Sequence, residues 1–211
     1  MEYDLCETGK GNPMFLKLLQ NLQKAFSIVK TNLKIWDEAI TSSRSHLDSV
    51  QNLSEQHHCC KHAEGLNDIT KKFPDVKAKL LYKIDTEINS HMTHLYAAVD
   101  VCKVVCDKVI KQNERCQAVY KKVCNDLDLI TQRSPTCPSA VEMFEWLHDS
   151  ECLMMRDYQK KKHLLAMFSL TERDHESALY KQWCAGDREL HQTINEYLQY
   201  MEFFLEMKII M

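Results

Sequence analysis

The densest group of potential metal ligands consists of His57, His58, Cys59, Cys60 and His62. Imidazole and thiolate are donors that zinc accepts readily. Adjacent residues cannot all face one ion, however, and no second Cys/His pair follows at the spacing of a zinc finger. The group also falls where the first helical pattern fades into a predicted loop. We therefore favour ordinary polar side chains here, with zinc binding as the alternative.

Two further pairs have spacings that occur in metal or redox sites. His91 and His94 lie three residues apart, but the Glu of an HExxH motif and a third ligand are absent. Cys102 and Cys106 are separated by one helical turn within an apolar pattern. The sequence thus favours histidines on a polar helix face and cysteines packed in a core, and it predicts no metal or other cofactor.

Glycines are too few and too scattered to form a nucleotide-binding loop. The chain has four, at positions 9, 11, 65 and 186, so they cannot build the Gly-rich turn that holds phosphates. No GxSxG turn is present to expose a nucleophile. These observations argue against ATP binding and against catalysis by this chain.

The most concentrated basic element is the run Lys160, Lys161, Lys162 and His163, with Arg156 one turn earlier. Such a run usually forms a solvated helix face, and contact with ribosomal RNA or an acidic partner is the functional alternative. The formal net charge is −3 and the pI is about 6.4. A surface wholly committed to nucleic acid would normally carry a basic excess.

The composition favours an all-α protein. Of the 211 residues only four are Gly and four are Pro, while 45% are hydrophobic and 27% charged, so long periodic segments and few tight turns are expected. No apolar stretch reaches membrane-spanning length, and the acidic N-terminal residues do not match a signal peptide. We expect a cytoplasmic and nuclear protein whose cysteines are reduced and mostly internal.

The first helix is predicted to begin at Asn12 and Pro13, because Asn caps a helix and Pro suits its first turn. Apolar residues then recur at alternating three- and four-residue steps, which is a heptad seam. Ser43 is the polar exception, and the hydroxyl-rich residues 41–45 leave open one continuous helix or two collinear ones. The seam consists of Leu19, Leu22, Phe26, Val29, Leu33, Trp36, Ile40, Leu47 and Val50.

A second seam follows a connection near residues 57–73 and runs from Leu81 to Ile130, about 50 residues. Two such helices most simply form an antiparallel, coiled-coil-like hairpin. Asn113 interrupts this seam. It either selects the register against a partner helix or marks a point where the seam reaches solvent.

Two prolines within residues 134–138 make that segment the clearest linker, since proline disfavours helix in the residue before it. Ser139 and Glu142 then form a capping box that opens a third helix. Thr171 and Asp174 give a weaker form of the same signal for a short helix that ends near Gly186, and a last helix follows. The predicted division is an N-terminal tail at 1–12, a helical hairpin at 13–133, a linker at 134–138 and a smaller C-terminal helical module at 139–211.

Several sequence blocks occur in a characteristic order along most of the chain. The most specific lies in residues 139–165, which begin SAVEMFEWLHD and continue through Tyr158 to KKKHLL. Trp36 with NLSEQ, the segment FPDVK, Trp183 and the closing FFLE accompany it. In these blocks the chain resembles the AIRIM family, the AAA+ ATPase-interacting ribosome maturation factors.

The resemblance implies a non-enzymatic adaptor of a heteromeric, tandem-ring AAA+ ATPase of the spermatogenesis-associated family, together with a second small helical subunit, CINP (cyclin-dependent-kinase-interacting protein). That assembly recycles shuttling factors from large-subunit ribosome precursors, with a further role at replicating chromatin. A generic coiled-coil scaffold, or a trafficking or cytoskeletal tether without an ATPase link, is the alternative. Candidate partner-binding residues are Glu145, Trp146, Tyr158, Lys161, Lys162, Phe203 and Phe204.

Overall fold

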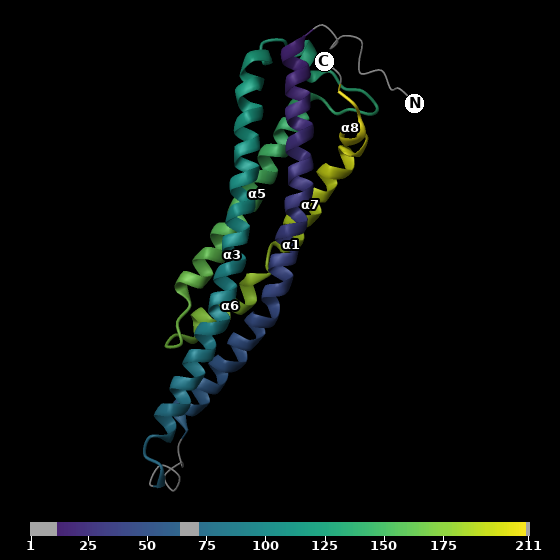
Figure 1. Cartoon of the computed structure of the whole chain (residues 1–211). Helices are drawn as coiled ribbons and strands as arrows, with labels where there is room; N and C mark the ends of the chain where they lie inside the picture. Colours follow the sequence, from purple (N-terminus) through teal and green to yellow (C-terminus); the bar gives the residue numbers. More distant parts are fainter. Residues whose placement is uncertain (1–11, 64–71, 210–211) are drawn as a thin grey trace. The chain divides into compact units, whose positions relative to one another are not determined.

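The computed structural model describes residues 12–63 and 72–209, and these residues form an all-α structure without strands, as predicted (Figure 1). Two long helices are followed by shorter ones. The elements are α1 (Pro13–His62), α3 (Val76–Val123), α4 (Leu127–Thr131), α5 (Ala140–Met167), α6 (Arg173–Trp183), α7 (Asp187–Tyr200) and α8 (Glu202–Glu206). The predicted N-terminal tail and the predicted loop glycine at position 65 lie outside the described residues, apart from residue 12.

Helix α1 is one continuous helix of 50 residues, which decides between the two alternatives for residues 41–45. The Asn12 carboxamide oxygen caps it, accepting hydrogen bonds from the backbone N–H groups of Met14 and Phe15 at 3.0 and 3.2 Å. The Ser42, Ser43 and Ser45 hydroxyls donate to backbone carbonyls three residues earlier, so they leave the helix intact. All nine predicted seam residues are buried.

Helix α3 runs antiparallel to α1 (Figure 1). Where α1 ends and α3 begins, the Nζ of Lys77 donates a hydrogen bond to the Lys61 carbonyl at 2.9 Å. Further along, Nε2 of His57 lies 3.5 Å from the Asp85 carboxylate. The predicted hairpin is confirmed.

The prediction that the second helix continues to Ile130 is wrong. Helix α3 ends at Val123. The Asp126 carboxylate accepts a hydrogen bond from the Leu129 N–H at 3.2 Å and starts the separate helix α4. Leu127, predicted on the seam, is 66% exposed in consequence, whereas Ile130 is buried.

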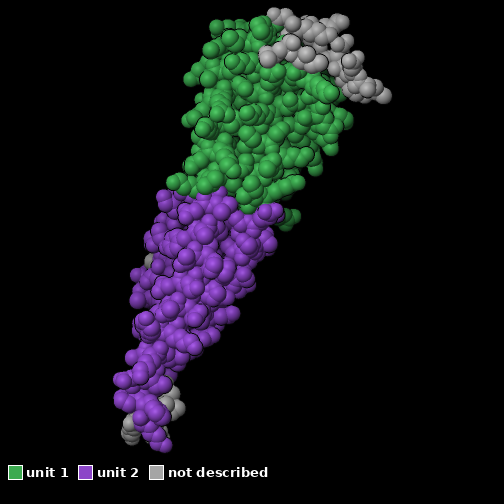
Figure 2. Space-filling view, viewed as in Figure 1, with its two compact units in different colours: residues 1–36, 103–157, 186–211 green, residues 37–102, 158–185 purple. Residues whose placement is uncertain are grey.

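The chain divides into two compact units (Figure 2). Unit 1 contains residues 1–36, 103–157 and 186–211, and unit 2 contains residues 37–102 and 158–185. Helices α1, α3 and α5 therefore each contribute one segment to each unit. Each unit combines segments from before and after residues 134–138. The predicted division of the chain at these residues stays a prediction.

Unit 1 is held together by contacts among α1, α3, α5 and α8. The side chain of Asn113, 2% exposed, donates a hydrogen bond to the Glu151 carboxylate, so the seam does not reach solvent at this point. The rings of Tyr120 and Phe144 stack with centroids 4.8 Å apart. From α1, Nε2 of Gln23 donates to the carbonyl oxygens of α8 and its C-cap, including that of Phe204 at 2.8 Å.

The predicted capping box at the start of α5 is confirmed. The Ser139 hydroxyl accepts a hydrogen bond from the Glu142 N–H at 3.2 Å, and the Glu142 carboxylate accepts from the Ser139 N–H at 2.9 Å. The Glu142 carboxylate also accepts a hydrogen bond from the Ser139 hydroxyl at 2.8 Å. The bonds it accepts from the Ser139 N–H and hydroxyl, together with Arg133, lower the pKa of Glu142 although its partial burial opposes them. The helix start is therefore fixed by residues that directly follow the predicted linker.

Unit 2 has a polar contact at the centre of its core. The indole N–H of Trp183 donates to the Ser43 hydroxyl at 3.0 Å, and Ser43 donates in turn to the Ile40 carbonyl at 2.7 Å. Trp183 is fully buried and Ser43 is 2% exposed. The single polar residue on the predicted α1 seam thus has a partner from α6.

The predicted cap at Thr171 is wrong, because the N-cap of α6 is Glu172 and its side chain makes no capping bond. The Thr171 hydroxyl lies 2.8 Å from the Ser169 hydroxyl instead. The end of this helix near Gly186 is as predicted. Gly186 has a φ of +103°, a conformation that side-chain-bearing residues rarely adopt, and α7 begins directly after it.

Candidate partner-binding surface

The residues with metal-ligand side chains do not form a metal site in the described part of the chain, where no group of three or more His, Cys, Asp or Glu residues is suitably placed. Residues 57–62 belong to the last turns of α1, not to a loop. There His57 faces Asp85, Cys60 is buried and Cys59 is exposed.

His91 and His94, predicted to lie on a polar helix face, both contact His46 of α1. Nδ1 of His91 lies 3.0 Å from Nδ1 of His46, and the ring of His94 stacks on that of His46 with centroids 4.1 Å apart. Burial and the two neighbouring imidazoles lower the pKa of His46. The lowered pKa favours the neutral form of the His46 imidazole at the α1–α3 contact.

The cysteines are less internal than predicted. Among the described cysteines, Cys59 and Cys152 are exposed and three others are half-buried. Those that are buried are Cys60, Cys102, Cys106 and Cys116. Burial is the main cause that raises the pKa of Cys106 and Cys116 to about 12. Cys102 and Cys106 are packed in the core, as predicted, and the described cysteines form no disulfide with one another.

The interpretation of the basic run as one solvated face is wrong for Lys161, which is fully buried with its ammonium 5.9 Å from the centre of the Trp183 ring. Helical spacing explains this, because Lys161 follows Tyr158 by three residues and precedes Leu165 by four, on the buried face of α5. Lys160 donates a hydrogen bond to the Ala185 carbonyl. Of the three lysines, Lys162 is the exposed one.

Burial separates the seven predicted partner-binding residues into two groups. Glu145, Lys162 and Phe203 are exposed and Trp146 is half-buried, whereas Tyr158, Lys161 and Phe204 are buried. The buried three support the helical core, and only the others are accessible to a partner. Partner binding by these residues stays a prediction.

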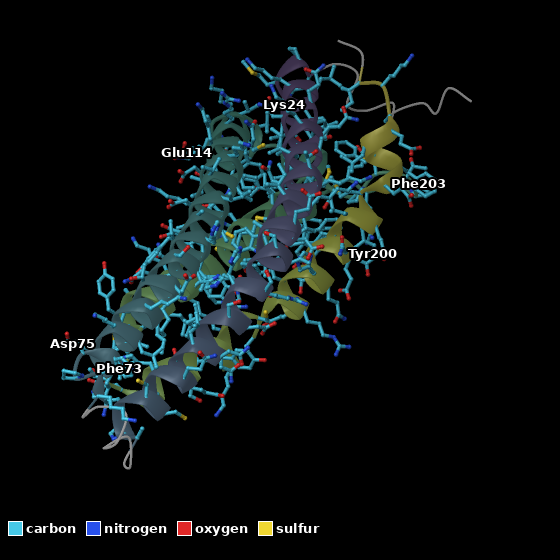
Figure 3. The ribbon with its side chains drawn as sticks, turned by 60° about the horizontal axis from the view of Figure 1, so that its bottom comes forward. Lys24, Phe73, Asp75, Glu114, Tyr200 and Phe203 are labelled. Carbon is cyan, nitrogen blue, oxygen red and sulfur yellow. The ribbon has the colours of Figure 1, made fainter. Side chains whose placement is uncertain are left out.

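An aromatic stack surrounds Trp146 in unit 1. Its ring stacks against Tyr197 and Tyr200 of α7, with centroid distances of 5.5 Å in both cases. Tyr200 is 61% exposed, and Phe203 of α8 is 63% exposed. Figure 3 shows both side chains extending outward from the C-terminal helices. Only Tyr197 continues the alternating apolar spacing of Leu190 and Ile194, so the sequence pattern gives no signal for Tyr200 as a member of the stack.

Acidic side chains border this stack. The Tyr197 hydroxyl donates to the Asp149 carboxylate at 3.2 Å. Burial raises the pKa of Tyr197, and the negative charges of Asp149, Glu145 and Glu196 raise it further. Glu145 and Glu196 directly precede Trp146 and Tyr197 in the chain. We define the acidic aromatic surface as Glu145, Trp146, Asp149, Glu196, Tyr197 and Tyr200.

Fold and surface together define an all-α protein with an exposed aromatic surface of the kind used in protein contacts. The chain belongs to the family described as "Ribosome biogenesis protein C1orf109-like", which matches residues 16–203. None of the helices among the described residues is long and apolar enough to cross a membrane.

Curated relatives agree with this family. A human protein named "AFG2-interacting ribosome maturation factor" is 28% identical over 196 residues, covering 90% of this chain and 96% of the relative. The Xenopus tropicalis protein of the same name is 25% identical over 155 residues, covering 72% and 76%. A mouse protein of that name is 24% identical over 217 residues, covering 90% of each chain. The predicted resemblance to ATPase-interacting ribosome maturation factors is confirmed.

Proposed function

We propose that this chain is a non-enzymatic adaptor that binds an AFG2-type AAA+ ATPase and acts in ribosome maturation. The observation that carries the proposal is the family match over residues 16–203, together with relatives whose name states both the interaction and the process. The scattered glycines of this chain do not suit phosphate binding, so ATP hydrolysis is assigned to the ATPase.

In its finer form, the proposal places the chain in a heteromeric tandem-ring ATPase complex with CINP as second small subunit. The complex recycles shuttling factors from large-subunit ribosome precursors in the cytoplasm and has a nuclear role at replicating chromatin. These details rest on the family resemblance of the capped Glu-Trp-Leu helix and the aromatic C-terminal residues.

We assign the acidic aromatic surface, with the adjacent Phe203, as the contact with the ATPase. Tyr and Trp side chains carry a large share of binding energy at many protein interfaces. In unit 1 the Trp146 ring of α5 is already stacked on Tyr197 and Tyr200 of α7. Its side chain therefore loses little conformational entropy when a partner binds.

The test is affinity purification of the tagged full-length chain from cell lysate, followed by mass spectrometry. The wild type is expected to recover a tandem AAA+ ATPase as its main partner. The double variant Tyr200→Ala/Phe203→Ala should lose most of it. The matched control Phe73→Ala/Tyr82→Ala also removes one exposed Phe and one exposed Tyr, which are 64% and 75% exposed, and should retain it.

The outcomes separate the function from the surface. If the wild type recovers no such ATPase, the adaptor function is refuted and the alternative of a generic helical scaffold or tether is favoured, for which the α1–α3 hairpin would suffice. If both double variants bind as the wild type does, the adaptor function stands but its assignment to this surface is wrong. Circular dichroism checks that the variants remain helical.

A further inference from the structure

The segments of α5, α7 and α8 around the acidic aromatic surface contain no lysine or arginine. The whole chain contains 27 Lys and Arg, but none occurs in residues 140–155 of α5 or in residues 189–207 of α7 and α8. Four acidic residues lie in each of these two segments. A basic partner would therefore meet no like charge from these segments.

Part of this negative charge is used inside unit 1. Glu142 caps α5 and lies 3.3 Å from the Arg133 guanidinium, Glu151 accepts from Asn113, and Glu189 lies 3.2 Å from Arg156. The carboxylates that border the aromatic stack form a second set, namely Glu145, Asp149 and Glu196, and all three are exposed. Asp149 accepts a hydrogen bond from the Tyr197 hydroxyl and Glu196 one from the Gln192 amide, both with neutral donors.

The aromatic rings add a second property to this surface. Tyr200, 61% exposed, covers one side of the stack, and the Trp146 ring beneath it is half-buried. A guanidinium group binds flat on such rings through their negative faces. It also forms two parallel hydrogen bonds with a carboxylate, which an ammonium group cannot do. Rings bordered by carboxylates therefore match arginine better than lysine.

We propose that the acidic aromatic surface binds an arginine-containing basic segment of a partner protein. The proposal deepens the proposed function, on which it rests for the existence of a partner, by naming the chemistry of the segment that is recognised. A nucleic acid is the wrong ligand, because its phosphates would approach Glu145, Asp149 and Glu196 without a neutralising cation.

The indole N–H signals of the full-length ¹⁵N-labelled protein provide a direct test. The chain has three tryptophans, and two of them, Trp36 and Trp183, are fully buried. The Trp146 signal is assigned with the variant Trp146→Phe. An oligo-arginine peptide at physiological salt should shift this signal and leave the other two in place. An oligo-lysine peptide of equal length should bind more weakly.

Charge reversal provides the matched variants. Glu145→Lys/Glu196→Lys should weaken binding of the oligo-arginine peptide by about tenfold or more, which is a typical effect of reversing charges at an interface. Glu87→Lys/Glu114→Lys changes the net charge equally at two exposed positions of α3 and should bind as the wild type does. Tyr200→Ala should also weaken binding without altering the charge.

Three results would overturn the proposal: an oligo-arginine peptide that leaves the Trp146 signal in place, equal binding by the two charge-reversal variants, or a single-stranded RNA that shifts the Trp146 signal. The titration needs no ATPase, so its failure is distinguishable from failure of the adaptor function. Conversely, peptide binding with no ATPase recovered from lysate would support the surface and refute the adaptor function.

Discussion

Replacing Ser43 by Ala tests the polar contact in the core of unit 2. The Ser43 hydroxyl accepts the hydrogen bond from the Trp183 indole N–H at 3.0 Å, and both side chains are buried. Ser43→Ala removes one oxygen atom and leaves the indole N–H without this acceptor. Water has little access, because the Trp183 side chain is fully buried.

A buried donor that loses its acceptor costs about 1–3 kcal/mol. The higher helix propensity of Ala returns up to about 0.5 kcal/mol at this position. We therefore expect the free energy of unfolding to fall by about 0.5–2.5 kcal/mol. For a chain of 211 residues each kcal/mol corresponds to about 2–4 °C in melting temperature.

Urea denaturation followed by circular dichroism measures this difference. Ser42→Ala is the matched control, because its exposed hydroxyl donates only to the Ala39 carbonyl and its loss should leave stability unchanged or slightly higher. The double variant Ser43→Ala/Trp183→Phe should show a favourable coupling energy between the two side chains. Equal stability of Ser43→Ala and Ser42→Ala would refute the reasoning.

Three further predictions concern local chemistry. Ser139→Ala should cost about 1 kcal/mol in chemical denaturation, because the capping box with Glu142 opens α5. His46 has a lowered pKa in the fold, so the free energy of unfolding should decline as pH falls below about 6.5. His46→Gln should flatten this decline in melting curves recorded between about pH 5 and 7. Iodoacetamide at about pH 8 should modify exposed Cys152 in the folded protein and spare Cys116, whose pKa is raised to about 12, as peptide mapping by mass spectrometry would show. Rapid labelling of Cys116, or a pH profile unchanged by His46→Gln, would contradict the respective prediction.

The helices and their buried faces are predictable because periodicity is local. Residues three and four positions apart share a helix face, so seam residues such as Leu22 and Trp36 are identified as core without knowledge of their partners. The same holds for the capping box, whose two residues are three positions apart. The break after Val123 was not predicted, although Asp126 is a typical N-cap residue, because the apolar steps continue through it.

Contacts between distant parts of the chain are not accessible from periodicity. In the sequence Ser43 is only a polar exception in the apolar seam, because the residue that donates a hydrogen bond to it, Trp183, lies 140 residues later. Lys161 reads as part of a basic run, although its spacing from Tyr158 and Leu165 indicates the buried face. Tyr200 joins the aromatic stack only because α5 and α7 meet at Trp146. The acidic character of this surface is visible in the sequence, but only once the two segments are known to be neighbours.

The hydrogen bond between Asn113 and Glu151 has a consequence for how the helices of unit 1 choose their alignment. Apolar seams with heptad spacing tolerate a sliding error of seven residues, since leucine, valine or methionine then meets another apolar side chain. Such a slip would place Asn113 level with Phe144 or Tyr158 in place of Glu151. Phe144 offers no hydrogen-bond acceptor and Tyr158 offers only a neutral hydroxyl, so the buried Asn113 amide would lose the carboxylate that accepts from it. One polar pair thereby adds to the preference of the packed side chains for the observed alignment.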